Sequence, residues 1–163
     1  PTLSEAYVLL GGICLQRGDL EGCYRFNQRA TKARAGFAEG YGNMAFVLLQ
    51  LIDGKDEKED SEKLDKAIKF LKKAIIHNKN FVQAYTTLGT AYFMKGLVEE
   101  GIKANLEAVE IQPEFPIAHN NLAVAYLEKQ DYDNAIHHCD KAVEQGFEVA
   151  VELLDELKPH RKS

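Results

Sequence analysis

Apolar side chains recur along most of the chain with the spacing of an amphipathic helix. Between positions 85 and 109 they stand three, four and seven residues apart, and the run breaks at Lys95 and Gly96. Residues at these spacings lie on one face of a helix, and glycine favours a turn. The stretch therefore predicts two amphipathic helices joined by a tight turn. The apolar positions on the two helices are Tyr85, Leu88, Tyr92, Ile102, Leu106 and Val109.

The same helical pair returns along the chain with a fixed period. Tyr7, Tyr41, Tyr85 and His119 are separated by 34, 44 and 34 residues. The small residues Ala30, Ala74, Ala108 and Ala142 are separated by 44, 34 and 34 residues. One period of 34 residues with a single ten-residue insertion explains both series, and a period in this range is typical of stacked helical repeats.

One unit carries the signature residues of a known repeat. Its sequence, VQAYTTLGTAYFMKGLVEEGIKANLEAVEIQPE, is similar to the tetratricopeptide repeat, whose pattern is W-x2-L-G-x2-Y followed by A and P. The matching residues are Tyr85, Leu88, Gly89, Tyr92, Ala108 and Pro113. The resemblance implies an all-α fold, a right-handed α-solenoid of about four helix-turn-helix repeats in one domain spanning 1–163. The expected repeats cover about 4–37, 38–81, 82–115 and 116–147, and the Leu-rich stripe after Gly146 predicts a C-terminal capping helix over about 148–158.

The insertion falls inside the second repeat, near residues 52–61, in a segment rich in acidic residues and lysine. We expect Gly54 to end the helix before it and Asp60 or Ser61 to cap the helix after it. The added residues then form a solvated loop, because extending a loop costs little closure entropy. The alternative is a protrusion that contacts a partner.

Composition and charge narrow the class of protein. The 163 residues carry 20 Lys plus Arg against 25 Asp plus Glu, for a net charge of −5, and 45% are hydrophobic. This composition excludes a disordered chain, and the acidic balance argues against nucleic-acid binding. No apolar run is long enough for membrane insertion, no signal peptide is visible, and the three cysteines lack a ligand spacing, so we expect a cytoplasmic protein. Because the chain does not begin with Met, a complete protein and a piece of a longer one both stay open.

Candidate chemistry is sparse. No phosphate-loop, nucleophile-elbow or HExxH pattern occurs, so we expect no enzyme activity, no cofactor and no metal site. His137, His138 and Cys139 attract attention as metal ligands, but consecutive helix residues point about 100° apart. Cys14 and Cys23 are expected to be packing residues, with a redox pair as the alternative. His119, where other repeats have Tyr, is expected to pack in the core, with a pH switch as the alternative.

The resemblance implies recognition of another protein. In tetratricopeptide repeat proteins the first helices of the repeats line a concave groove that holds an extended segment or a helix of a partner. We therefore expect a protein-binding adaptor or scaffold; the alternatives are a self-assembling structural protein and a regulatory module of a larger protein. The groove residues carried over by register are Leu9, Asn43, Phe46, Leu49, Thr86, Thr90, Phe93, Asn120, Asn121, Val124 and Leu127.

A subgroup of the family holds the carboxylate end of chaperone tails with a clamp of Lys, Asn, Asn, Lys and Arg. The five corresponding places here hold Val8, Gly12, Asn43, Gln83 and Thr87. Only Asn43 matches, so the charge-assisted hydrogen bonds that a terminal carboxylate needs are expected to be missing.

The first helix is apolar on almost every face. Its sequence, AYVLLGGICL, leaves Leu9 and Ile13 on the side that a preceding repeat would cover. Terminal repeats normally present a polar outer face. We therefore expect self-association of the chain through this helix.

Overall fold

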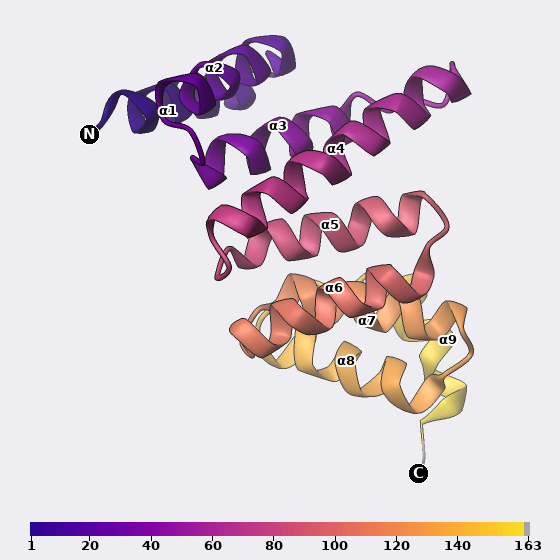
Figure 1. Cartoon of the computed structure of the whole chain (residues 1–163). Helices are drawn as coiled ribbons and strands as arrows, with labels where there is room; N and C mark the ends of the chain where they lie inside the picture. The colour runs from indigo at the N-terminus through magenta and orange to yellow at the C-terminus, as the bar shows by residue number, and fades with distance from the viewer. Residues whose placement is uncertain (162–163) are drawn as a thin grey trace.

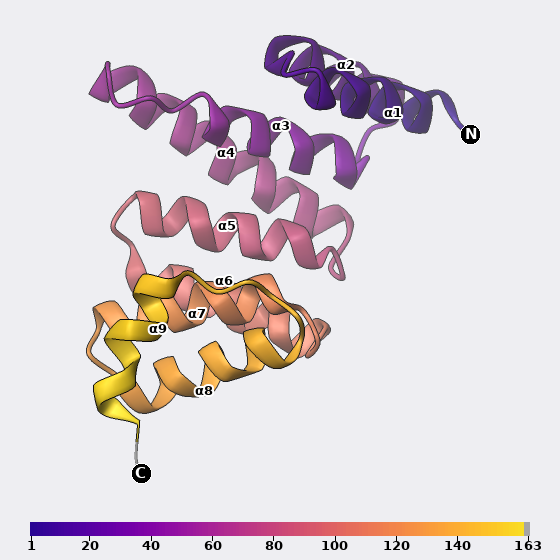
Figure 2. The same ribbon diagram turned by 180° about the vertical axis from the view of Figure 1, so that it is seen from behind.

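A computed structural model describes residues 1–161 of the chain. Within that range it contains nine α-helices and one short 3-10 helix, and no strand. The helices pair as antiparallel neighbours, and the pairs stack so that the two termini lie at opposite ends of the array (Figures 1 and 2). This arrangement confirms the predicted all-α solenoid. The helices are α1 Leu3–Gln16, α2 Leu20–Ala33, α3 Ala38–Gln50, α4 Glu57–His77, α5 Val82–Met94, α6 Val98–Ile111, α7 Pro116–Glu128, α8 Tyr132–Glu144, α9 Val151–Leu157 and the 3-10 helix Lys158–His160.

Short turns separate the two helices of three repeats. Gly18 and Gly96 adopt φ angles of 74° and 76°, and Gln130 occupies the equivalent place with φ 59°. Glycine tolerates this left-handed backbone, which side chains disfavour. The next helix begins at once: the carboxylate of Asp19 accepts a hydrogen bond of 2.7 Å from the backbone N–H of Gly22 at the start of α2. This sharp reversal brings each helix pair into direct contact.

Small side chains let the paired helices approach closely. The four alanines that mark the period, Ala30, Ala74, Ala108 and Ala142, are completely buried. A second buried series pairs a small residue on the first helix of a repeat with one on the second helix. Its members are Gly11 with Cys23, Ala45 with Ala67, Gly89 with Gly101 and Ala123 with Ala135.

A second contact between paired helices involves rings. Tyr7 lies beside Phe26 with a centroid separation of 6.4 Å, and Tyr41 beside Phe70 at 6.0 Å. In the fourth repeat His119 and His138 take the same places, 5.2 Å apart. The third repeat has Tyr85 in the first place and Ala104 in the second. The third repeat therefore lacks the second ring of this pair.

The ten-residue insertion differs from our expectation of a loop. Leu64 stands in register with Val98, the first residue of α6, whereas α4 begins at Glu57. Most of the added residues therefore extend α4, and the helix is capped by Asp56 instead of Asp60 or Ser61. Asp60 is buried and accepts a hydrogen bond of 2.7 Å from the backbone N–H of Gly54. The carboxylate of Asp60 thus ties the preceding turn to the extended helix, a contact that a solvated loop could not make.

Helix α9 closes the C-terminal end of the array. Gly146, with φ 82°, lies two residues after the end of α8, and from there the chain turns back towards α9 (Figure 2). Leu153 and Leu157 on α9 are buried against Ala123 and Cys139. No helix among residues 1–161 is long and apolar enough to cross a membrane.

Candidate peptide-binding groove

The odd-numbered helices α1, α3, α5 and α7 share one face of the solenoid, and this face is hollowed. A cavity of ≈ 550 Å³ lies between α1 and α3, and one of ≈ 540 Å³ runs from α3 across α5 to α7. Phe46 lines both cavities, so they adjoin at this side chain, and the two together are called the groove. The first cavity is lined by Val8, Leu9, Gly12, Ile13, Leu15, Gln16, Cys23, Asn43 and Phe46; the second by Phe46, Leu49, Gln50, Gln83, Thr86, Thr87, Thr90, Met94, Phe115, Ile117 and Asn121.

Two groove asparagines are held by buried asparagines on the second helices. The side-chain N–H of Asn43 donates a hydrogen bond of 2.9 Å to the side-chain carbonyl oxygen of Asn27. The side-chain N–H of Asn121 donates one of 3.1 Å to the side-chain carbonyl oxygen of Asn105. Asn27 and Asn105 are themselves completely buried, and each donates to a backbone carbonyl one turn earlier in its helix. Asn43 and Asn121 are therefore fixed in orientation, with their side-chain carbonyls left to accept hydrogen bonds in the groove.

The threonines of α5 are also oriented by their own helix. The hydroxyl of Thr87 donates to the carbonyl of Gln83 at 2.7 Å, and that of Thr90 donates to the carbonyl of Thr86 at 3.2 Å. With their protons used, these hydroxyl oxygens face the groove as acceptors. The groove thus offers acceptors to the N–H groups of an extended peptide.

The hollows on this face differ in charge. The two cavities contain no Asp, Glu, Lys or Arg among their lining residues. A third hollow of ≈ 500 Å³, beside α9, is lined by Val124 and Leu127 together with Glu128, Glu152 and Glu156. The C-terminal end of the face is therefore acidic, whereas the rest is apolar and neutral.

The predicted groove residues fall into three groups. Leu9, Asn43, Phe46, Leu49, Thr86, Thr90 and Asn121 line the two cavities, and Val124 and Leu127 line the third hollow. Asn120 is half-buried and lines none of them. Phe93 packs against Gly101 on α6 and against the cluster of Ile102 and Leu122, so its ring faces the helix interface instead of the groove.

Three apolar residues that line the second cavity were absent from the residues assigned by register to the groove: Met94, Phe115 and Ile117. Ile117 and Met94 are both 46% exposed although apolar. They stand at the ends of α5 and α7, where the repeat pattern assigns no groove position. An exposed apolar residue beside the stripe was the signal that could have located them.

Cys23 and Cys139 are buried packing residues. Burial is the largest of the causes that raise the pKa of the Cys23 thiol, and also of the Cys139 thiol. Both therefore stay protonated, which suits a small apolar side chain and opposes thiolate chemistry. All three cysteines are free, and residues 1–161 hold no group of three or more side chains able to bind a metal ion.

A histidine pair joins α7 to α8 behind the groove. His119 Nε2 lies 2.9 Å from the carbonyl oxygen of Pro113, which can only accept, so this nitrogen carries the proton. His119 Nδ1 then accepts from Nδ1 of His138, 2.9 Å away. Burial is the first cause that lowers the pKa of His138 from 6.5 to about 4, followed by the neighbouring His119 and His137. His138 is therefore neutral at pH 7.

Comparisons with known proteins identify the repeat. The tetratricopeptide repeat family model matches residues 116–145, which span α7 and α8. Residues 116–145 are therefore a tetratricopeptide repeat (TPR), and the solenoid as a whole has the fold of TPR proteins. TPR proteins are generally non-enzymatic modules of protein–protein interaction.

The relatives match this chain at low sequence identity. The TPR chain is 26% identical over 74 residues to the Hsp70-Hsp90 organising protein of Plasmodium falciparum (isolate 3D7), a match that spans 45% of this chain and 13% of that protein. A thermophilic TPR protein of Thermus thermophilus superposes with a TM-score of 0.80 and 20% identity, over 96% of this chain and 80% of that one. The first TPR of Spaghetti (RPAP3), solved with the HSP90 peptide SRMEEVD, superposes with a TM-score of 0.68 and 18% identity. This match covers 78% of this chain and 94% of that one.

Proposed function

We propose that this TPR chain is an adaptor that binds an extended, mainly apolar segment of a partner protein in the groove of its odd-numbered helices. The continuity of the two cavities through Phe46 carries this proposal. Apolar walls bury the partner's side chains, and the oriented carbonyls of Asn43 and Asn121 accept hydrogen bonds from its backbone. The glutamates beside α9 favour a basic residue at the end of the segment that lies there.

The groove is tested with a peptide selected from a random library on the full chain. Phe46 is 38% exposed at the junction of the cavities, so Phe46→Ala should weaken the selected peptide by about 1 kcal/mol or more, roughly a fivefold to tenfold rise in Kd. Leu106→Ala is the matched control, since Leu106 on α6 is an apolar residue with nearly the same exposure, 37%, and lines neither groove cavity. Calorimetry measures the affinity of both variants for the peptide. Unchanged affinity in Phe46→Ala with weaker binding in Leu106→Ala would place the site on the opposite face.

The specificity proposal concerns the end of the peptide. The groove places corresponding to the carboxylate clamp hold no Lys or Arg; they hold Val8, Gly12, Asn43, Gln83 and Thr87. Peptides with an acidic C-terminal sequence, SRMEEVD included, should therefore bind no better as free acids than as C-terminal amides. Calorimetric titration of the matched pair provides the measurement. A clear preference for the free acid would contradict the proposed neutral groove.

Self-association is a second candidate function, favoured by exposure on α1. Leu10 and Ile13 are 42% and 45% exposed, whereas their counterparts in the other repeats are buried under the preceding helix pair. Those counterparts are Met44, Leu88 and Leu122 for Leu10, and Val47, Ala91 and Ala125 for Ile13. A second copy of the chain could cover the same stripe, together with Leu9 at its edge.

Sedimentation velocity over a wide concentration range tests this second candidate. We expect concentration-dependent association that Leu9→Glu or Ile13→Glu weakens, because either change buries a charge in the contact. Val151→Glu adds the same charge to an exposed apolar site on α9 and should leave association unchanged. A chain that stays monomeric at every concentration would exclude this function.

A further inference from the structure

The third repeat lacks one ring of a contact that the other three repeats make. Phe26, Phe70 and His138 face a ring on the first helix of their repeats, at centroid separations of 6.4, 6.0 and 5.2 Å. Ala104 occupies the same register position on α6, opposite Tyr85. The fold around it is otherwise that of its neighbours, so the missing ring leaves space between α4 and α6.

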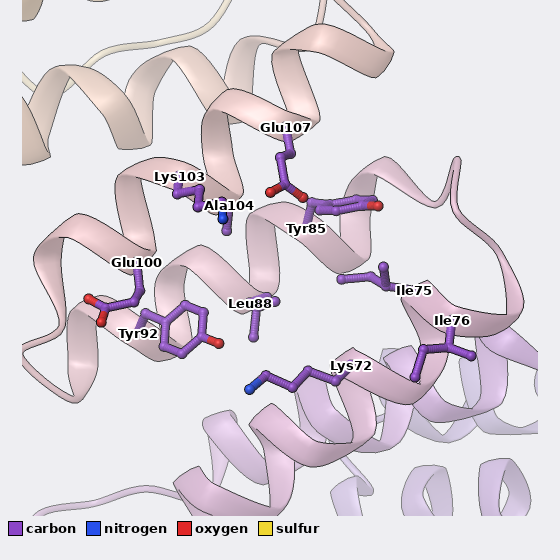
Figure 3. A pocket seen from close by; sticks show the side chains of 10 residues that line it. All are labelled: Lys72, Ile75, Ile76, Tyr85, Leu88, Tyr92, Glu100, Lys103, Ala104 and Glu107. Carbon is purple, nitrogen blue, oxygen red and sulfur yellow. The ribbon is translucent and has the colours of Figure 1, made fainter.

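That space is an open cavity of ≈ 420 Å³ on the face of the even-numbered helices (Figure 3). Its floor is apolar and buried, formed by Tyr85, Leu88 and Ala104, with Ile75 and Tyr92 beside them. A cavity of about 150 Å³ already accommodates a benzene ring. The cavity is thus large enough for an aromatic side chain and the backbone next to it.

The Tyr85 side chain, which forms part of the cavity wall, is held in a fixed orientation. The hydroxyl of Tyr85 donates to the backbone carbonyl of Lys79 at 3.2 Å, which holds the ring in place. Burial, and then the Glu107 carboxylate, raise the pKa of Tyr85, so the hydroxyl keeps its proton. In Figure 3 the Glu107 side chain lies beside the Tyr85 ring, at the edge of the opening.

The residues at the opening of the cavity are suited to bind an aromatic side chain that belongs to another protein. Lys72 on α4 places its ammonium group 5.9 Å from the Tyr92 centroid, close enough to attract a second ring as well. Lys66 and Lys73 stand over the ring pair of the second repeat in the same way, 5.9 Å from Phe70 and 5.5 Å from Tyr41. Ile76, at the opening, is 70% exposed and needs a surface larger than a small molecule to cover it.

We propose that this cavity is a second binding site, which takes an aromatic side chain presented by a partner protein. The guest ring supplies the contact that Phe26, Phe70 and His138 supply elsewhere. Residues beside the guest cover Ile76, and the glutamates and lysines of the rim pair with charges of both signs. A second copy of the chain is a poor source of a Phe or Tyr ring, because the most exposed Phe or Tyr within residues 1–161 is Phe46, in the groove. The proposal is independent of binding in the groove.

Methyl NMR on the full chain tests the site with N-acetylphenylalaninamide as the probe. We expect saturable shifts of the Ala104, Leu88 and Ile75 methyl resonances, while methyl groups in the groove stay unchanged. N-acetylleucinamide at the same concentration should not displace the probe. Absence of saturable shifts at these methyls, or equal competition by the leucine amide, would overturn the proposal.

Substitutions that fill the cavity with a larger side chain of the chain itself provide a second test. Ala104→Phe restores the ring of the other repeats, so it should abolish probe binding and raise the thermal midpoint by about 2–4 °C. Ala108→Phe is the matched control one turn later in α6, where the completely buried Ala108 leaves no room and the same change should lower the midpoint. If Ala104→Phe does not fold, Ala104→Leu fills the cavity in part and should weaken the probe severalfold. Probe binding at full strength in a folded Ala104 variant would contradict the site.

Discussion

Replacing Gly89 by Ala should lower the free energy of unfolding by about 2–3 kcal/mol, even though alanine is the better helix former. A methyl group at Gly89 would overlap the side-chain amide nitrogen of Asn105 and lie 3.1 Å from the backbone carbonyl oxygen of Gly101. Asn105 is completely buried and holds Asn121, so it cannot move aside without breaking two hydrogen bonds. Urea denaturation of the variant measures the loss.

The other repeats show which combination relieves this overlap. Gly11 faces Asn27 and Gly89 faces Asn105, whereas Ala45 and Ala123 stand in repeats that carry Leu71 and Cys139 in the asparagine position. Gly89→Ala combined with Asn105→Cys should therefore recover most of the lost stability. Gly12→Ala is the control, because a methyl group there meets no atom within 4 Å. A Gly89→Ala variant as stable as the parent would show that the two helices are not in close contact at this point.

Lowering the pH from 7 to 5 should cost about 2 kcal/mol of unfolding free energy through His138 alone. Its pKa is about 4 in the folded chain and 6.5 as the ordinary value, so between these values the unfolded chain binds more protons than the folded one. The stability is complete above pH 6.5 and is lost as the pH falls towards 4. Denaturant midpoints measured across this range give the slope.

A double substitution isolates the histidine contribution from other titrating groups. His119→Tyr with His138→Phe recreates the Tyr41–Phe70 pair of the second repeat. Tyr85 shows that a tyrosine hydroxyl reaches the equivalent carbonyl, since it donates to Lys79 as His119 does to Pro113. The double variant should lose the excess pH dependence and keep its stability at pH 7. Identical pH profiles for the two proteins would show that His138 is not a buried neutral group.

The period of the sequence predicts most of this fold, because each repeat must bury the same faces. The register of Tyr85, Leu88 and Tyr92 places α5 and α6 and, by translation, the other helix pairs. The same register assigns Phe46 and Thr90 to the face of the odd-numbered helices, where both line a cavity.

Features that break the period could not be predicted in this way. The charged residues after Gly54 have the composition of a loop, but the buried Asp60 and its bond to Gly54 make them the start of a longer α4. Phe93 stands in a groove register, yet Gly101 on the facing helix leaves room for its ring at the helix interface. In both cases a tertiary contact between distant positions decides the outcome.

The central proposal is that the face of the odd-numbered helices holds the partner segment, and site-directed photocrosslinking tests it most directly. A photoreactive residue is placed at Thr90, at Ile117 or, on the even-numbered face, at Lys103, and the full chain is mixed with the selected peptide. Thr90 and Ile117 line the groove, and Lys103 lines the cavity between α4 and α6. The account predicts crosslinks from positions 90 and 117 and none from position 103. Crosslinks from position 103, with positions 90 and 117 silent, would contradict it.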